Sequence, residues 1–419
     1  MGRQLGSGSG IGELMDDLGN ALAGGGADLK MLGGGQPARI PQVEAVWRRR
    51  MEEILAEPGG LDRALTIYDP PQGNPRFLRA IAGLFRDTFG WNTGPENVAV
   101  TSGGQTAFFL LFNLLAGPMP DGSRKKILLP LVPEYIGYAD QGTDGGLFRA
   151  ITPRIEKTGA HEFKYRVDFD GIEIAPDIAA ICASRPTNPS GNVLSDAEVA
   201  RLSGLAERHG IPLILDNAYG APFPGILFED ATPFWRPHVI LTFSLSKIGL
   251  PGTRTGIVIG PPEIIRALGS MNSIVGLSNP NIGQQVITPL IESGEILRLS
   301  REVVRPFYQH RRDLALDAAR EAFGDAVDWQ VHRSEGALFL WFRFPGLRIT
   351  SKELYQRLKR RNVLVIPGEY FFFGHDDPSW KHRQECIRVS YAMDENAVRD
   401  GLRIIAEEVV RATHLPAGA

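Results

Sequence analysis

The sequence predicts an α/β fold in which a mostly parallel seven-stranded sheet forms a large domain, joined to a smaller α+β domain. Two patterns predict it. From about residue 75, short apolar β-branched runs alternate with longer amphipathic stretches, as in repeated strand–helix–strand units. From about residue 300, a long charged helix leads into strand-rich segments. The 419 residues are 43% hydrophobic and 22% charged, which is enough apolar material for two packed domains.

The first element expected is a helix that ends before Pro58-Gly59-Gly60. Val43, Val46, Trp47 and Ile54 fall near one face of this helix, and a proline followed by two glycines stops it. The chain before it is polar and contains a cluster of three glycines at 33–35.

Seven apolar runs are expected to form the sheet of the large domain. Buried parallel strands read as near-continuous apolar runs, and helices are expected between them, at 105–115 and at 195–209. The last two runs are separated by a loop too short for a helical crossover, so we expect them to pair antiparallel. The seven runs are 97–101, 126–131, 147–152, 179–184, 212–216, 238–243 and 255–259.

The smaller domain is expected to combine both ends of the chain. Its predicted elements after residue 300 are a helix at 300–323, a strand-rich patch at 336–344, a helix at 350–361, strands at 363–366 and 386–391, and a helix at 394–412. The predicted division assigns 60–300 to the large domain, and 1–59 together with 301–419 to the small one.

Composition excludes several classes of function. Lys and Arg total 45 against 48 Asp and Glu, and a near-neutral chain without a basic tract argues against nucleic-acid binding. Cys182 and Cys386 lack the spacing of a metal or redox site, so we expect neither a metal nor a disulfide framework. No apolar run approaches the length of a membrane span, and the first ten residues lack the apolar segment of a signal peptide. We therefore expect a soluble cytoplasmic protein.

Polar residues follow four of the expected strands, at the sheet edge where ligands of open α/β sheets bind. The segment 101–105 (TSGGQ) runs into a helix, and its two glycines can let backbone N–H groups close around a phosphate. An ordinary turn is the alternative for that segment. The segment 185–191 (RPTNPSG) fixes a rigid turn that holds Asn188 at the edge, although such a turn alone is common.

Asp216 ends one strand and Lys247 follows the next. A buried aspartate is costly unless it meets a positive partner, although it can also cap a helix. Desolvation and the nearby Arg254 would lower the pKa of Lys247 and free its amine for imine formation; a solvated surface lysine is the alternative. Asn188, Asp216 and Lys247 recur about thirty residues apart, one crossover unit each time. Together with the phosphate cradle, they are the parts of a pyridoxal phosphate (PLP) site.

With these residues in place, the chain resembles the class I/II aminotransferases, which have the PLP-dependent transferase fold type I. The resemblance runs from about residue 10 to 412. It rests on seven phrases: LGGGQP at 32–37, YDPPQG at 68–73, PEYIGYAD at 133–140, SRPTNPSGN at 184–192, DNAYGAPFPGI at 216–226, SLSKIGLPGTRTG at 244–256 and EGALFLWF at 335–342.

The resemblance implies a role for each matching residue. Lys247 would attach the cofactor as an imine and shuttle a proton, and Asp216 would pair with the ring nitrogen. Tyr219 and Asn188 would bind the ring hydroxyl, and Tyr135 would stack on the ring. The phosphate would be held by Gly103, Gly104, Gln105, Ser244, Ser246 and Arg254, with Tyr68 reaching the site of a neighbouring subunit in a homodimer; Arg388 and Gly34 would hold the substrate carboxylate.

The reaction that the resemblance implies is ping-pong transamination between a small aliphatic amino acid, valine or alanine, and pyruvate or 2-oxoisovalerate. The apolar segment 370–373 favours an aliphatic side chain over a dicarboxylate. A β-lyase, or an aminotransferase with a different amino donor, is the alternative.

Two other classes of protein fit less well. A serine acyl-enzyme has short motifs that match Ser244-x-x-Lys247, 190–192 (SGN) and 157–159 (KTG), but they occur in the wrong order and leave Asp216 and Arg388 unexplained. A non-catalytic regulator module would need a DNA-binding domain before the glycine cluster, and only about thirty non-basic residues precede it.

Overall fold

The computed structural model describes residues 12, 16, 19 and 28–413. Its largest element is a mixed eight-stranded sheet with the order β2-β11-β10-β9-β8-β4-β3, in which β5 pairs with β4. All seven predicted strands lie in this sheet; β3, a two-residue Gly-Pro strand, was not predicted. The strands are β2 (Val98–Thr101), β3 (Gly117–Pro118), β4 (Arg124–Leu129), β5 (Phe148–Ala150), β8 (Ile178–Ser184), β9 (Leu213–Asp216), β10 (Val239–Ser244) and β11 (Gly256–Ile259).

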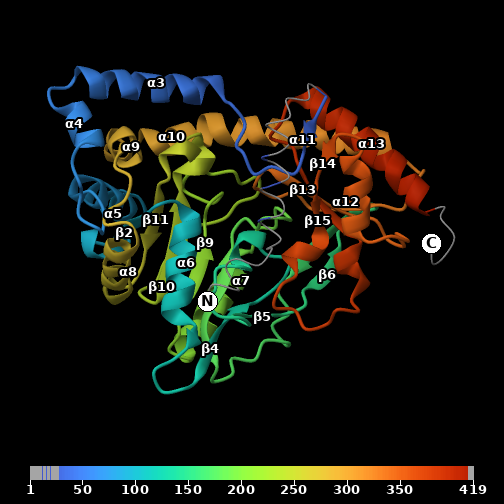
Figure 1. Ribbon diagram of the computed structural model, residues 1–419, viewed down its shortest axis with the longest axis horizontal. Coiled ribbons are helices and arrows are strands. Elements are labelled where there is room, and N and C mark those ends of the chain that lie inside the picture. Colours follow the sequence, from blue (N-terminus) through green and yellow to red (C-terminus); the bar gives the residue numbers. More distant parts are fainter. Residues whose placement is uncertain (1–11, 13–15, 17–18, 20–27, 414–419) are drawn as a thin grey trace.

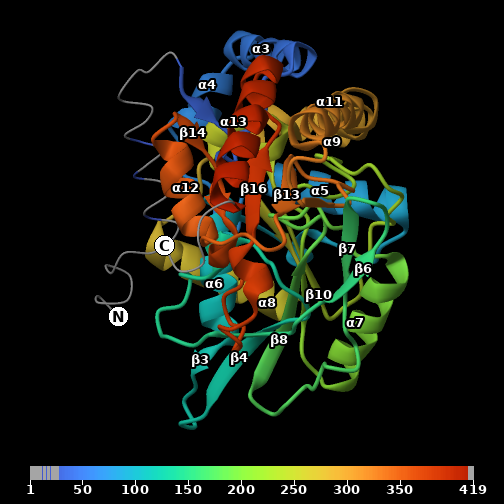
Figure 2. The ribbon, with the colours of Figure 1, turned by 90° about the vertical axis from the view of Figure 1, so that its right-hand side faces the viewer.

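The centre of the sheet is parallel and one side is antiparallel. β4, β8, β9 and β10 run parallel, whereas β11 pairs antiparallel with both β10 and β2. This confirms the antiparallel pairing predicted for the last two strands. Helices cover both faces, with α6 (Gly104–Leu115) and α7 (Asp196–Arg208) on opposite sides (Figure 2). Ser195 caps α7 in a capping box with Glu198, because its hydroxyl accepts from the Glu198 N–H.

A second, six-stranded sheet has the order β15-β16-β13-β12-β7-β6. Two of its strands, β6 and β7, come from the middle of the chain, inside the predicted large domain. They join the rest of the sheet through the parallel pair β7–β12. The sequence did not indicate this hairpin, because its short strands are rich in charged residues. The strands are β6 (Arg154–Lys157), β7 (Glu162–Arg166), β12 (Gln330–His332), β13 (Phe339–Arg343), β15 (Ile366–Pro367) and β16 (Cys386–Ser390).

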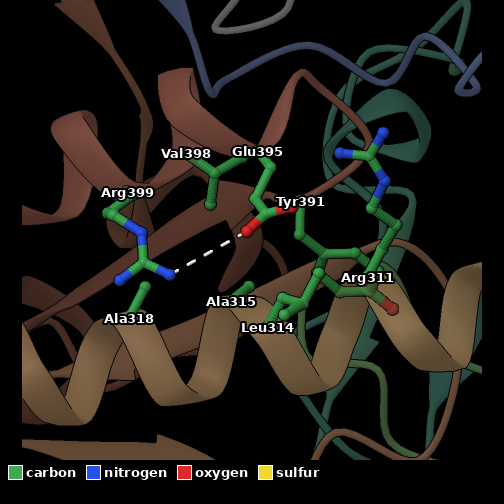
Figure 3. A pocket seen from close by; sticks show the side chains of 8 residues that line it. All are labelled: Arg311, Leu314, Ala315, Ala318, Tyr391, Glu395, Val398 and Arg399. Atoms are coloured by element: carbon green, nitrogen blue, oxygen red, sulfur yellow. Dashed lines mark ion pairs between the residues drawn. The ribbon is translucent and has the colours of Figure 1, made fainter.

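Helices α11 (Arg305–Phe323), α12 (Ser351–Lys359) and α13 (Glu395–Thr413) pack around the second sheet (Figure 1). α11 continues from α10 (Glu295–Leu299) through a π-helical turn at Ser300–Val304. Figure 3 shows the small pocket between α11 and α13, where Ala315 and Ala318 allow a close approach and Glu395 pairs with Arg399. None of the predicted site residues lines this pocket. The division into two domains stays a prediction.

The N-terminal part of the described chain joins the two sheets. β1 (Lys30–Met31) pairs with β14 (Val363–Leu364), and the Leu32 carbonyl accepts from Ser390 N at 2.7 Å, so the three glycines at 33–35 lie beside β16. α3 (Pro41–Ala56) then crosses one end of the molecule (Figure 1). Its buried face contains the predicted Val43, Trp47 and Ile54, with Val46 partly buried.

The remaining helices flank β2 and its neighbours. They are α4 (Gly60–Leu65), α5 (Pro75–Phe89), α8 (Pro262–Val275) and α9 (Ile282–Glu292). In the part of the chain that the structure describes, no helix is both long and apolar enough to cross a membrane.

Candidate active site

The candidate site lies where the strands of the large sheet end. In the register of the sheet, Asp216 pairs with Ser184 on one side and with Thr242 on the other. Gly256 lies between Ser244 and Thr101 in the same way. The segments that follow β2, β8, β9 and β10 therefore meet at one edge, as the sequence predicted from the strand ends.

Lys247 lies in a short helical turn, η3 (Leu245–Ile248), directly after β10. Its Nζ donates to the Gly35 carbonyl at 2.6 Å and lies 5.4 Å from the centre of the Tyr219 ring. Burial, together with the charges of Arg388 and Arg254, lowers the pKa of Lys247 to about 8. An amine with this pKa is partly neutral near neutral pH, which is the form that attacks a carbonyl or accepts a proton.

Asp216 is buried at the end of β9 and accepts three hydrogen bonds. The donors are the Tyr138 hydroxyl at 2.5 Å, the Ala218 N–H at 2.8 Å and the Thr242 hydroxyl at 3.2 Å. Burial raises the pKa of Asp216, while the bond from Tyr138 opposes that rise. No ion pair with Asp216 is found among residues 28–413, so this desolvated carboxylate suits a cationic ligand atom such as a protonated ring nitrogen.

The predicted phosphate cradle is formed at the start of α6. Gly103 has φ +91°, a conformation that favours glycine, and a Cβ there would displace the Arg254 guanidinium from its present place. A Cβ on Gly104 would lie 3.9 Å from the Ser244 Cβ, and the Ser244 hydroxyl is 3.0 Å from that of Ser246. Helix N–H groups, two hydroxyls and a guanidinium thus surround one point, which makes an anion site.

Tyr135 and Gln105 connect this cradle to the segment after β4. The Tyr135 hydroxyl donates to Gln105 Oε1 at 3.3 Å, and Gln105 Nε2 donates to the Gly137 carbonyl at 2.9 Å. The Tyr135 ring packs edge-on against Tyr138, with centroids 5.2 Å apart. This arrangement places an aromatic face beside the cradle.

Arg388 reaches the site from β16 in the second sheet. It donates to Asn188 Oδ1 at 2.6 Å and to the Gly33 carbonyl at 2.7 Å, and its guanidinium lies 4.1 Å from the centre of the Phe339 ring. Its Nε is buried without a partner, and burial lowers the pKa of Arg388 to about 10. A buried N–H that lacks an acceptor fits a site for a small carboxylate. Gly34 lies between the two glycines whose carbonyls hold Arg388 and Lys247.

The structure therefore brings together every predicted site residue except Tyr68. Tyr68 follows α4 and is 77% exposed. Sequence reasoning missed Tyr138, Thr242, Ser184 and Glu134, which surround Asp216. Ser184 ends β8 and Thr242 lies two residues before the end of β10, both paired with Asp216, so strand position could have found these two. No local signal in the segment 133–140 marks Tyr138 and Glu134.

Comparison with known proteins identifies the family. The family model for aminotransferase class I and II matches residues 35–405. The chain belongs to this family. The predicted family, fold class and enzyme class are thereby confirmed, and the serine acyl-enzyme and regulator readings are excluded.

Within the family, the chain is highly similar to two valine–pyruvate aminotransferases. The chain is 46% identical over 404 residues to valine–pyruvate aminotransferase of Escherichia coli, covering 96% of both chains. The crystal structure of valine–pyruvate aminotransferase from Salmonella typhimurium aligns with a TM-score of 0.88 and 44% identity, over 96% of this chain and 99% of that one. Aspartate aminotransferase of Thermus thermophilus shares the fold, with a TM-score of 0.75 and 23% identity over 97% and 99% of the two chains. The seven sequence phrases also resemble those of valine–pyruvate aminotransferase within the family.

Proposed function

We propose that this aminotransferase depends on PLP and exchanges an amino group between valine or alanine and pyruvate or 2-oxoisovalerate. The observation that carries the proposal is that Asp216 and Arg388, from two different sheets, both lie close enough to Lys247 for their charges to act on its pKa. The high identity to valine–pyruvate aminotransferases over the whole chain supports the choice of substrates.

The residues present fit PLP. Asp216 offers a desolvated carboxylate to a ring nitrogen, and the cradle at Gly103 offers a phosphate site. Ser244, Ser246 and Arg254 would complete the phosphate contacts, Tyr135 would cover one ring face, and Asn188 with Tyr219 would hold the ring hydroxyl. Bound PLP supplies an electron sink for the electron pair left when the amino acid loses its Cα proton.

The chain's own groups bind the substrate and move the proton. Arg388 binds the substrate carboxylate through its fork, including the unpartnered Nε. Lys247 Nζ, held by the Gly35 carbonyl, accepts the proton from Cα of the amino donor, and in the second half of the reaction it delivers a proton to Cα of the amino acid that forms from the oxo acid. Because Gly34 is flanked by the two glycines that hold these side chains, it brings backbone close to the same carboxylate.

The surroundings of Lys247 favour a small aliphatic side chain. A cavity of about 260 Å³ opens beside Lys247, and its apolar lining includes Ile40, Val43 and Trp47. Arg39 also lines this cavity, where it pairs with Glu44 at 2.5 Å, so a side-chain carboxylate would have to compete with Glu44 for it. Phe371, from the predicted apolar segment, lies 5.4 Å from the Arg388 guanidinium.

A homodimer is part of the proposal. Large apolar side chains are exposed on α3, α4 and the end of α8, and the Asn281 side chain ties the segment after α8 to α4 through the Arg63 carbonyl. An exposed apolar surface of this kind is typical of an interface. Tyr68 stands within it and would reach the partner's phosphate site. The exposed residues are Leu55, Leu61, Leu65, Ile67, Tyr68, Ile274, Val275 and Leu277.

Steady-state assays with a panel of amino donors and oxo acids test this function. We expect turnover of valine and alanine with pyruvate and 2-oxoisovalerate, and a visible cofactor absorbance that borohydride removes. Lys247→Ala should lose both turnover and that absorbance. Strong turnover of aspartate or an aromatic donor, with none of valine or alanine, would exclude the proposed substrates. The cytoplasmic location stays a prediction.

A further inference from the structure

A second buried carboxyl group lies close to Asp216. Glu134 is fully buried, and both of its oxygens are hydrogen-bonded. Oε1 contacts the Ser184 N–H at 2.8 Å, and Oε2 contacts the Ser184 hydroxyl at 2.7 Å and the Tyr135 N–H at 3.0 Å. Among the described residues, Glu134 forms no ion pair. A buried glutamate without a cation is costly as an anion, so its protonation state needs an explanation.

A chain of hydroxyl groups joins Glu134 to Asp216. The Ser184 hydroxyl lies 3.3 Å from the Tyr138 hydroxyl, and Tyr138 donates to Asp216 Oδ2 at 2.5 Å. The four side chains come from the segment after β4, the end of β8 and the end of β9. They therefore form one continuous path that ends on Asp216 Oδ2.

The hydrogen bonds of this path can point in two directions, depending on whether Glu134 carries a proton. Each hydroxyl has one hydrogen to donate. When Glu134 is ionised, the Ser184 hydrogen points to Glu134, and the Tyr138 oxygen receives no hydrogen bond from the path. When Glu134 is protonated, it donates to Ser184, Ser184 turns to Tyr138, and every hydrogen points toward Asp216. Hydrogen bonds aligned in this way polarise one another and strengthen the last one, which stabilises the Asp216 anion.

The charges around the path favour the protonated state. Glu134 faces the Cys182 thiol, the Ser184 and Tyr138 hydroxyls and the Asp216 carboxyl, and its own N–H donates to the Phe371 carbonyl. Burial raises the pKa of Glu134 most, the hydrogen bonds that it accepts lower it, and the charge of Asp216 raises it further. The result is a pKa of about 7. The cations of the site, Lys247 and Arg388, act on Asp216 and its surroundings rather than through a contact with Glu134.

We propose that Glu134 is a positioning residue that, in its protonated state, aligns the Ser184 and Tyr138 hydroxyls toward Asp216 and keeps Asp216 anionic opposite the cofactor ring. Ionisation of Glu134 reverses the Ser184 hydroxyl and places a second negative charge beside Asp216. The inference rests on the proposed function for its consequence in catalysis, but the protonation of Glu134 is a property of the chain itself.

Infrared difference spectroscopy of the cofactor-free protein tests the protonation directly. The wild-type chain should show the carbonyl stretch of a buried carboxylic acid at mildly acid pH, and the band should fade as the pH rises through about 7. Glu134→Gln should lack this band, whereas Asp168→Gln, a change at a partly exposed carboxyl elsewhere, should keep it. Absence of the band in the wild type, or its survival in Glu134→Gln, would overturn the proposal.

The pH profile of the cofactor-loaded enzyme tests the consequence. If the protonated state is needed, kcat/KM of the wild type should fall roughly tenfold per pH unit above about pH 7. Glu134→Gln presents a permanent N–H donor to Ser184, so this alkaline loss should disappear, and Ser184→Ala should lower kcat/KM at all pH values because it cuts the path. Parallel pH profiles of the wild type and Glu134→Gln would overturn the role. Failure of the wild type to bind PLP would instead refute the proposed function. The infrared test would still be valid, because it uses the cofactor-free protein.

Discussion

Replacing Glu134 by glutamine should remove a pH dependence from the stability of the cofactor-free protein, because this fully buried side chain can then no longer ionise. Glutamine has the same shape, and its amide can donate to Ser184 as the protonated carboxyl does. The variant keeps an oxygen for the Ser184 N–H, but its NH2 group cannot accept from the Tyr135 N–H as Oε2 does, which lowers its stability by a similar amount at every pH. Because glutamine cannot ionise, the difference in stability from the wild type should depend on pH in a way that the pKa of Glu134 determines.

The size and sign of this effect come from the pKa shift. Burial raises the pKa of Glu134 from 4.5 to about 7, so between these values the folded chain holds a proton that the unfolded chain has lost. The resulting stability is fully present below about pH 4.5 and is lost as the pH rises through about 7. Since a tenfold change in proton affinity is worth about 1.36 kcal/mol, a rise of the pKa from 4.5 to about 7 corresponds to about 3 kcal/mol. The free energy of unfolding of Glu134→Gln should thus gain about 3 kcal/mol on that of the wild type over this range.

Denaturant unfolding of both cofactor-free proteins, at one protein concentration and a series of pH values, measures this difference. Glu335→Gln is the matched control, because Glu335 is equally buried but pairs with Lys164. That variant removes the negative charge that pairs with the buried Lys164, which keeps the Val193 carbonyl as an acceptor, so it should be less stable than the wild type throughout the range. A difference between Glu134→Gln and the wild type that does not change with pH would mean that Glu134 is ionised in the folded protein, and would refute the reasoning.

Three further substitutions test the other parts of the site. Arg388→Lys loses the planar fork, which costs about 1.5–3 kcal/mol, so kcat/KM should fall roughly ten- to hundredfold for amino and oxo acids alike; an unchanged value would remove Arg388 from the carboxylate site. Gly103→Ala forces a Cβ against Arg254 at φ +91°, so PLP affinity measured by absorbance titration should fall at least about tenfold, and normal affinity would contradict the cradle. Leu65→Glu should shift the protein from dimer to monomer in analytical ultracentrifugation, whereas Ile155→Glu, at an exposed apolar residue on β6, should not; a monomeric wild type would refute the dimer.

The sequence predicted the large sheet and its site because both depend on local patterns. Apolar runs mark buried strands, and polar residues directly after them mark one edge of the sheet, so Asn188, Asp216 and Lys247 could be placed together before their distances were known. The glycines of the cradle were predictable for the same reason, since a glycine pair before a helix has a local cause.

The features that escaped prediction depend on register and on contacts between distant segments. Tyr138 and Glu134 approach Asp216 only because β4, β8 and β9 are neighbours in the sheet, and nothing in their own segment indicates that. The hairpin β6–β7 was missed because its strands are short and charged and pair with β12, far along the chain. The role of Tyr68 needs a second subunit, so a single chain leaves it as a prediction.

Nitrogen transfer from labelled valine tests the central claim most directly. The loaded enzyme would be incubated with nitrogen-15-labelled valine and unlabelled pyruvate, and the products would be followed by mass spectrometry, with Lys247→Ala in parallel. The label should appear in alanine, 2-oxoisovalerate should form in equal amount, and the variant should transfer none. Label that stays in valine or is released as ammonia, or equal transfer by Lys247→Ala, would contradict the claim.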